Sequence, residues 1–172
     1  MKKLLLIVTL FVCQSLYANP VPFGLEINKT TLEETKEKYN LIENGINYYS
    51  QGSTYLIDPK ELSLDGLNRV LLIFSKENNI LLSVVATFSS YKFDSINNNL
   101  SQKYKLLKQS IPQRFVSDKY VEYKYGQSLI TLDAPHSSFD LHITYISEEF
   151  NKKVNEIRKS DKEQNKNEFN SL

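Results

Sequence analysis

The sequence predicts an α+β fold, with an antiparallel sheet built from two helix-plus-hairpin-plus-strand repeats and helices on one face. Three observations lead to this prediction. Short runs of β-branched and aromatic residues are separated by turn signals, two segments carry apolar residues at helical spacing, and one order of elements occurs twice. We expect the repeats at residues 28–88 and 92–146, within one domain covering residues 19–159.

Residues 1–18 have the pattern of a secretory signal peptide. Two lysines follow the first methionine, and residues 4–12 form an apolar run that is too short for a membrane span of ~20 residues. Cleavage is expected after Ala18, because an extended Asn-Pro segment follows this small residue. The mature chain is therefore predicted to be periplasmic or secreted, without an integral membrane span. Two alternatives are an N-terminal core element and a lipoprotein acylated at Cys13.

Composition excludes several kinds of chemistry. Removing eighteen residues from the 172-residue chain leaves 154, and the loss of Lys2 and Lys3 leaves 19 basic against 20 acidic side chains. This balance gives no electrostatic reason to expect nucleic acid or anionic membrane as a partner. Without Cys13 the mature chain contains no cysteine, which excludes disulfides, thiolate metal sites and a cysteine nucleophile.

The first half contains a predicted capped helix and two pairs of strands. Asn28 or Thr30 is expected to cap the helix, and Glu33 and Glu34 are favourably placed in its first turn. The last two strands are nearly continuous apolar runs, which indicates central strands covered on both faces. The expected elements are a strand at 22–27, a helix at 31–39, strands at 46–50 and 53–57, and strands at 69–75 and 80–88.

The second half repeats this order and adds a C-terminal helix. Phe93, Ile96, Leu100 and Tyr104 lie at helical spacing, and Gly126-Gln127 marks a hairpin turn. The expected elements are a helix at 94–105, strands at 120–125, 128–132 and 139–146, a helix at 148–159 with Phe150, Val154 and Ile157 on one face, and a flexible charged tail at 160–172.

Two pairs of segments support an internal duplication. Residues 38–42 (KYNLI) match 103–107 (KYKLL) at the end of each helix, and residues 46–53 can be placed over 121–128 around a glycine-containing turn. Chance similarity between strand-rich segments is the alternative.

Residues 23–27 (FGLEI) and 30–34 (TTLEE) resemble an opening strand followed by a capped helix. With a duplicated helix and meander in an exported chain of this size, they resemble the β-lactamase-inhibitor-protein architecture. They are also similar to the single unit of SmpA/OmlA-type small outer-membrane assembly lipoproteins. The resemblance covers residues 23–146 and implies a binding or assembly role; fold analogy alone does not assign function.

One segment brings acid, histidine and serine side chains together in the sequence. A small hydrolase would use such groups as nucleophile, base and orienting acid, and strand alternation places Asp140 and His142 on one face. No glycine-rich elbow exposes Ser137, so a polar turn followed by a solvent-facing strand is the alternative. The candidate residues are Asp133, His136, Ser137, Asp140 and His142.

Cofactor motifs are missing from the sequence. The two histidines lack the spacing of a zinc site, and the group Asp58, Glu61 and Asp65 lacks the ligand pattern of a calcium loop. Phosphate-loop and dinucleotide motifs are also missing, since none of the five glycines is grouped with another. We therefore predict no metal, no cofactor and no catalytic residue.

Tyrosines on the two hairpins form the remaining candidate binding surface, because tyrosine is enriched in protein interfaces. Ordinary cross-strand packing is the alternative. The candidates are Tyr48, Tyr49, Tyr55, Tyr120, Tyr123 and Tyr125. The sequence thus favours an exported, non-enzymatic module of the bacterial cell envelope that binds another protein, most concretely an inhibitor or immunity-like protein. A small hydrolase and an accessory to lipid or outer-membrane assembly are the alternatives, and the oligomeric state is left open.

Overall fold

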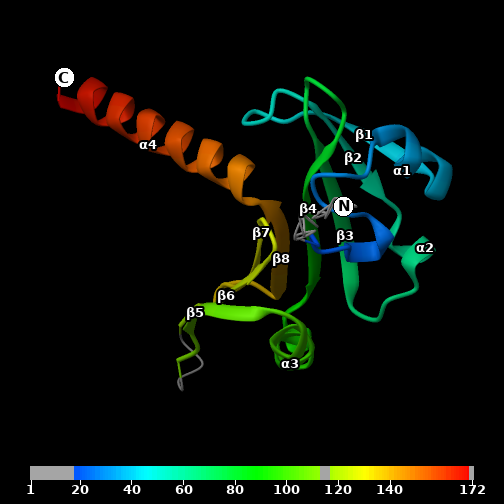
Figure 1. Cartoon of the computed structure of the whole chain (residues 1–172). Coiled ribbons are helices and arrows are strands. Elements are labelled where there is room, and N and C mark those ends of the chain that lie inside the picture. Colours follow the sequence, from blue (N-terminus) through cyan, green and yellow to red (C-terminus); the bar gives the residue numbers. More distant parts are fainter. Residues whose placement is uncertain (1–17, 113–116, 171–172) are drawn as a thin grey trace, which may run out of the picture.

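The computed structural model is an α+β protein with one eight-stranded antiparallel sheet, and it describes residues 18–112 and 117–170. The strand order is β1-β2-β3-β4-β8-β7-β6-β5 (Figure 1). The strands are β1 Leu41–Ile46, β2 Ser53–Ile57, β3 Leu67–Phe74, β4 Leu81–Ser89, β5 Lys105–Ser110, β6 Lys119–Tyr125, β7 Ser128–Ala134 and β8 Asp140–Ser147. The helices are α1 Leu32–Lys38, α2 Pro59–Leu62, α3 Phe93–Lys103 and α4 Glu148–Asn170, with 3-10 turns η1 Pro22–Gly24 and η2 Ser90–Lys92.

The sheet consists of two four-stranded meanders that meet at their last strands. Strands β1 to β4 follow one another across one half, and β5 to β8 follow one another across the other. Helix α1 precedes the first meander and helix α3 precedes the second. Because β4 pairs with β8, the first strand of each meander, β1 or β5, lies at an outer edge of the sheet.

The β4–β8 ladder joins the two halves over seven antiparallel residue pairs, from Ser83 with Ile146 to Ser89 with Asp140. The hydroxyl of Ser83 is buried and donates a hydrogen bond to the backbone oxygen of Tyr145 at 2.8 Å. The apolar runs predicted β3 and β4 as central strands covered on both faces. Both strands lie in the interior of the sheet, with β4 beside β8, but coverage on both faces is wrong, because Arg69 is exposed and Val85 and Thr87 are only half-buried on one side.

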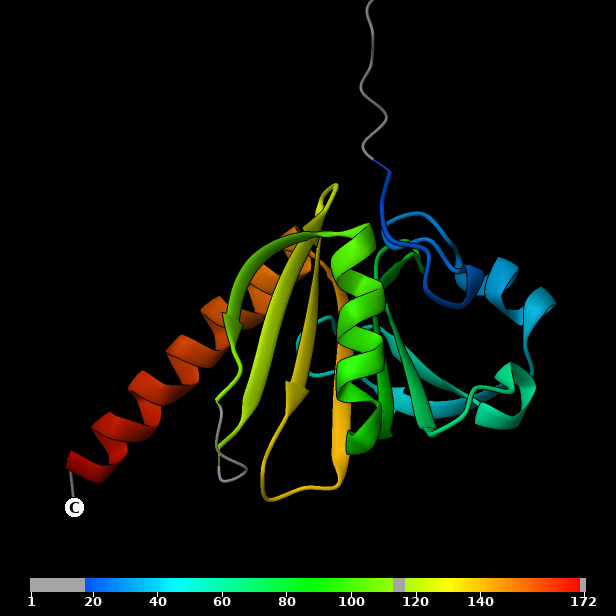
Figure 2. The same ribbon diagram turned by 90° about the horizontal axis from the view of Figure 1, so that it is seen from below.

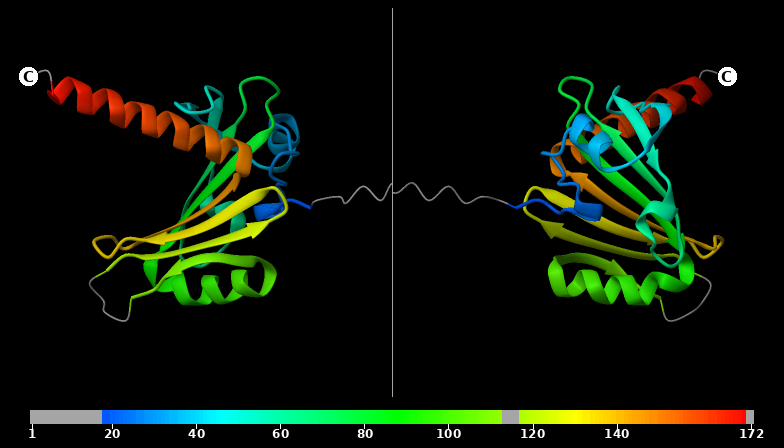
Figure 3. Two further views of the ribbon diagram at one scale, coloured as in Figure 1. Left: turned by 60° about the vertical axis from the view of Figure 1, so that its left-hand side comes forward. Right: turned by 90° about the vertical axis from the view of Figure 1, so that its right-hand side faces the viewer.

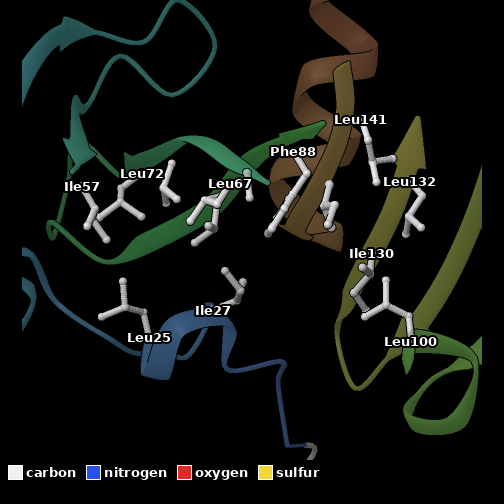
Figure 4. Packing of buried hydrophobic residues seen from close by; sticks show 14 of the residues in the cluster. Leu25, Ile27, Ile57, Leu67, Leu72, Phe88, Leu100, Ile130, Leu132 and Leu141 are labelled. Atoms are coloured by element: carbon white, nitrogen blue, oxygen red, sulfur yellow. The ribbon is translucent and has the colours of Figure 1, made fainter. Parts of the chain in front are cut away.

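The main hydrophobic core lies on one side of the sheet, which we call the core face. Leu25 and Ile27 of the N-terminal segment lie opposite Ile57 and Leu72 of the sheet (Figure 4). Helix α3 lies along the strands on the same side (Figure 2) and adds the buried residues Phe93 and Leu100. Burial of these side chains from both halves in one cluster ties the meanders together beyond their strand pairing.

Helix α4 packs on the opposite side of the sheet. Its buried residues Phe150 and Val154 contact Ile73 and Ile146 in a second, smaller cluster. Strand alternation places these two sheet residues away from the core face, so the expectation of helices on one face does not hold for α4.

The C-terminal helix is also longer than the sequence predicted. The expected end was Lys159, but α4 continues to Asn170, and its later turns project beyond the sheet (Figure 3). The additional turns contain two lysines, two glutamates and one glutamine, which are favourable helix formers in water, together with three asparagines, which are less favourable. No helix in the described ranges is both long enough and apolar enough to cross a membrane.

The start of α1 is fixed by a capping box at Thr31, not by Asn28 or Thr30. The Thr31 hydroxyl accepts a hydrogen bond from the Glu34 backbone N–H at 3.2 Å, and the Glu34 carboxylate accepts one from the Thr31 backbone N–H at 2.8 Å. The Thr30 hydroxyl instead accepts from the backbone N–H of Glu26. Glu33 and Glu34 lie in the first turn, as predicted.

Three local expectations are wrong. Residues 22–27 form the turn η1 and an irregular segment that leads into a second turn at Ile27, because Phe23 and Gly24 adopt positive φ angles that a strand does not allow. Residues 47–50 form a turn held by the Asn47 side chain, which accepts from two backbone N–H groups, and the first strand lies before them. Strand β5 was missed because all six of its residues are exposed and show no hydrophobic alternation.

The two pairs of repeat segments differ in outcome. Lys38 and Lys103 both end a helix, and Tyr39 and Tyr104 cap those helices just before a first strand. Residues 46–53, however, connect the first and second strands of their half, whereas 121–128 connect the second and third strands of the other. The second pair therefore does not occupy equivalent places in the topology.

Replacing Phe150 with alanine removes the largest apolar contact between α4 and the sheet. We expect Phe150→Ala to lower the free energy of unfolding by about 3 kcal/mol, in the range for a buried phenylalanine. Lys153→Ala, at an exposed position one turn further on, should change it by less than about 0.5 kcal/mol. Urea denaturation of the mature chain measures both values. Equal stability of the two variants would contradict this packing of α4.

Candidate functional site

The sheet side that carries α4 is covered by that helix only near one end. The rest of this side forms a surface that we call the open face, over which no described helix packs. It combines an apolar row, a polar row and the charged residues beside them. Its residues are Ile42, Leu56, Arg69, Leu71, Val85, Thr87, Lys108, Tyr120, Glu122, Thr131, Asp133, His142 and Thr144.

The apolar row crosses the sheet through direct cross-strand partners, which share a face. It begins at the edge with Ile42, which is 57% exposed, and continues through Leu56 and Leu71 to Val85. Beyond the β4–β8 ladder the same row continues as two threonines of β8 and β7. The row gives this face a continuous apolar strip over four strands, with small polar side chains after it.

The polar row runs beside the apolar row over five strands. Arg69 pairs with Thr87, Thr87 with His142, His142 with Asp133, and Asp133 with Tyr120. The Thr87 hydroxyl lies 3.3 Å from Nδ1 of His142. Both signs of charge therefore lie in one line across the middle of the open face.

Tyr120 is held as a hydrogen-bond donor at the end of this row. Its hydroxyl donates to the Glu122 carboxylate at 2.8 Å, and the Lys108 ammonium lies 5.7 Å from its ring centroid. Burial raises the pKa of the Tyr120 hydroxyl, and the hydrogen bond and negative charge of Glu122 and the charge of Asp133 raise it further. The phenol is consequently neutral at physiological pH.

The predicted acid, histidine and serine cluster divides into two places. Asp133 and His142 are cross-strand partners on the open face, and Asp140 lies two residues before His142 on the same side of β8. His136 and Ser137 lie instead in the exposed turn between β7 and β8. Within the described ranges, no hydrogen bond joins Ser137 to either histidine, so a serine–histidine–acid relay is not assembled.

His136 is held by an aspartate that the sequence analysis did not consider. Its backbone N–H donates to Oδ1 of Asp118 at 2.9 Å, and its ring Nδ1 lies 3.0 Å from the same oxygen. These contacts fix the β7–β8 turn against the start of β6. Hydrogen bonding from the His136 ring, followed by that from its backbone, lowers the pKa of the Asp118 carboxyl.

Groups of metal-binding geometry are not found among the residues that the structure describes. The acidic residues considered for calcium serve separate local roles. Asp58 caps α2 by accepting from the Lys60 backbone N–H at 3.0 Å, and Asp65 forms an ion pair with Lys92. Glu61 accepts from the backbone N–H of Asn40 at 3.3 Å.

The expectation that six tyrosines share an open surface is wrong, because strand alternation distributes them over both faces. Tyr123 is 1% exposed and belongs to the core, where its hydroxyl donates to the Asn97 side chain of α3 at 2.6 Å. Tyr55 packs on Phe74, and Tyr125 packs on Tyr104, with both pairs on the core-face side. Of the six, only Tyr120 lies within the open face as defined above.

The remaining two, Tyr48 and Tyr49, hold α4 to the β1–β2 turn. The Arg158 guanidinium donates to the Tyr49 hydroxyl at 3.2 Å and lies 5.4 Å from its ring centroid. The Tyr48 hydroxyl donates to Asp161 at 3.4 Å, while its side chain stays exposed. These contacts join the first hairpin to the middle of α4, two segments that are far apart in the sequence.

Sequence reasoning missed Arg69, Thr87, Leu56 and Ile42 as parts of a common surface. Arg69 does interrupt an apolar strand, which is a local signal for a solvent-facing position. Its alignment with Thr87 and His142, however, depends on the register of strands from both halves. No spacing in the sequence specifies that register.

The fold and this surface define an α+β protein whose antiparallel sheet has a core on one face and a partly uncovered strip on the other. No protein-family model, no curated protein and no solved structure matches the chain significantly.

A titration tests the separation of His136 from the open face. We expect the pKa of Asp118 to rise in His136→Ala. It should not reach the ordinary value of an aspartate carboxyl, because the backbone N–H at position 136 still donates a hydrogen bond to it. The pKa of the Asp118 carboxyl is lower in the folded chain than in the unfolded chain. The contact with His136 therefore stabilises the fold at pH values above the unfolded-state pKa, and this stabilisation is lost as the pH falls through the folded-state pKa. Carboxyl-detected NMR measures the shift.

The matched control is the other histidine. His142→Ala should leave the titration of Asp118 unchanged, because His142 lies on the sheet with Thr87 and Asp133. An Asp118 pKa that is the same in the wild type and in His136→Ala would contradict the described turn.

Proposed function

We propose that this protein is an exported, non-enzymatic binding module of the bacterial cell envelope that holds another protein against its open face. The observation that carries the proposal is the apolar strip from Ile42 to Val85, which is exposed at Ile42 and half-buried along the rest of its length, beside a line of charged and aromatic side chains. Contiguous exposed apolar surface rimmed by polar groups is typical of protein interaction sites.

The chemistry of this surface favours a protein over other partners. Arg69 and Asp133 bring opposite charges into one row, which suits a partner with mixed polar groups and does not suit the uniform negative charge of nucleic acid. Tyr120 adds an aromatic side chain whose hydroxyl is already oriented by Glu122. Aromatic and arginine side chains are enriched among the residues that dominate binding energy.

Duplication of an ancestral unit is part of the proposal. Each half contains a helix followed by four consecutive antiparallel strands, and the helices α1 and α3 both pack on the core face. In this view α4 is an addition to the second unit. The inhibitor-like or immunity-like part of the proposal rests on the resemblance of the sequence to the β-lactamase-inhibitor-protein architecture.

Export is proposed from the signal-peptide pattern, of which residues 1–17 lie outside the described residues. The proposed first residue of the mature chain, Asn19, contacts the folded domain. Its side-chain oxygen accepts from the Gln127 backbone N–H at 3.3 Å and from the Ser128 hydroxyl at 3.2 Å. Cleavage after Ala18 would therefore leave the mature N-terminus against the β6–β7 hairpin.

A charged substitution in the apolar strip tests the binding role. Val85→Asp would place a carboxylate where the proposed partner excludes water, and we expect binding to weaken at least about tenfold. The matched control is Asn99→Asp, which adds the same charge at an exposed position of α3 on the other side of the sheet. Immobilised mature protein is used to retain partners from envelope and culture extracts.

We expect wild type and Asn99→Asp to retain the same stoichiometric partner and Val85→Asp to lose it. Circular dichroism and thermal unfolding show whether Val85→Asp is folded. Equal retention of the partner by a folded Val85→Asp protein would count against the open face, and repeated failure to retain any stoichiometric partner would count against the binding role.

A further inference from the structure

A groove of about 510 Å³ lies on the core-face side of the sheet, away from the open face. Its floor consists of Ala86 and Phe88 of β4 with Ile143 and Tyr145 of β8, so it follows the junction of the two meanders. Helix α3 provides one wall, and Phe23 and Leu64 line the other. The volume is within the ~300–1,000 Å³ range of small-molecule sites.

The α3 wall has an apolar middle and a lysine at each end. Ile96 and Leu100 lie on successive turns between Lys92 and Lys103, and all four line the groove. At 1.5 Å per residue, the eleven steps from Lys92 to Lys103 span ~16 Å. The hydrocarbon part of a bilayer is ~30 Å thick, and one acyl chain spans about half of it. The groove wall is therefore about as long as one acyl chain.

Phe23 reaches the groove from a strained backbone. Its φ of 54° lies in the left-handed region, which a bulky side chain rarely adopts. Surrounding contacts hold it there, since its carbonyl accepts from the Tyr39 hydroxyl at 2.6 Å and the carbonyl of Gly24 accepts from Lys38 at 3.1 Å. The fold therefore maintains an unfavourable conformation that places an aromatic ring on the groove wall.

The two ends of the groove differ in their free hydrogen-bonding capacity. Lys92 is already paired with the Asp65 carboxylate, whereas the described residues provide no ion-pair partner for Lys103. Tyr145 lies near Tyr104, the residue after Lys103, and burial raises the pKa of its hydroxyl so that it stays a donor. No hydrogen bond of that hydroxyl occurs in the described part of the chain. A positive charge and a phenol donor are thus available at the same end.

We propose that this groove binds a single-chain amphiphile with an anionic head, such as a fatty acid. The chain lies on Ile143, Leu100 and Ile96, and the carboxylate accepts from Lys103 and Tyr145. Burial of a dozen-carbon chain against these apolar side chains supplies the affinity, and the head supplies the orientation. The proposal is independent of the protein-binding role, because the two sites are on opposite sides of the sheet.

Calorimetry of the mature chain with dodecanoate, below its aggregation concentration, tests the ligand class. We expect saturable binding of one molecule per chain. Dodecyltrimethylammonium, which has the same chain and the opposite charge, should bind at least about fivefold more weakly, and acetate should not bind detectably. Equal binding of the two amphiphiles, or binding that does not saturate near one equivalent, would overturn the proposal.

Two tryptophan substitutions on α3 locate the site. Asn99 lines the groove and Asn98 does not, and both are exposed, so Asn99→Trp obstructs the groove while Asn98→Trp adds the same side chain outside it. We expect Asn99→Trp to reduce dodecanoate affinity at least about tenfold and Asn98→Trp to leave it unchanged. Equal effects of the two substitutions would contradict the location.

The head contact is tested at Lys103. Lys103→Gln should lower the affinity for dodecanoate about two- to fivefold, as expected for the loss of a partly exposed ion pair. It should not lower the affinity for dodecyltrimethylammonium. An unchanged dodecanoate affinity would overturn the assignment of the head. Flotation with anionic phospholipid vesicles distinguishes a free amphiphile from a lipid in a membrane surface. We expect the wild-type protein to stay in solution. Co-flotation of the protein with the vesicles that persists in Asn99→Trp would overturn binding of a free amphiphile.

Discussion

Strands β4 and β8 pair over seven antiparallel positions and thereby join two four-stranded meanders into one sheet. Both candidate sites depend on this ladder. On one side it aligns Thr87 with His142 and Val85 with Thr144, which brings residues of the two halves into the open face. On the other side the same ladder provides the groove floor, where Ala86 lies opposite Ile143. A shift of one residue in this register would exchange the two surfaces.

The two sides of the sheet differ in what covers them. The core face receives the N-terminal segment and three helices, and it buries most of the large apolar side chains. Among the described residues, α4 is the one helix on the other side, where it is anchored by Phe150 and Val154 and held further along by contacts from the β1–β2 turn. A single helix crossing near one end leaves the apolar strip beyond it accessible, and this asymmetry is the structural basis for a binding role.

Local patterns predicted much of this fold. The apolar runs of β3 and β4, the alternation of β8, the hairpin at Gly126 and the helical spacing in α3 each identified an element. Strand β5 escaped prediction because its pairing with β6 is specified by neighbours and its own residues are all exposed. The turn at 47–50 escaped because tyrosines favour strands, while the Asn47 side chain holds the backbone in a turn.

The candidate sites were less accessible from sequence than the fold. The tyrosine surface failed because residues 123 and 125 alternate with 120 along an extended strand, so one hairpin supplies both the core and the open face. The polar row combines residues separated by as many as 73 positions, from Arg69 to His142, and only the three-dimensional register of the strands brings them into line. The groove likewise combines α3 with Phe23, whose backbone conformation no sequence rule predicted.

Native-state hydrogen exchange of the mature chain tests the central role of the β4–β8 ladder most directly. Amides hydrogen-bonded between these strands should exchange most slowly, at the free energy of global unfolding, and the edge strands β1 and β5 should exchange faster. A Ser83→Ala substitution, which removes the buried hydrogen bond to Tyr145, should accelerate exchange in both meanders together. Protection of each meander by itself, with β4 and β8 amides exchanging as fast as those at the edges, would contradict a single sheet held at this junction.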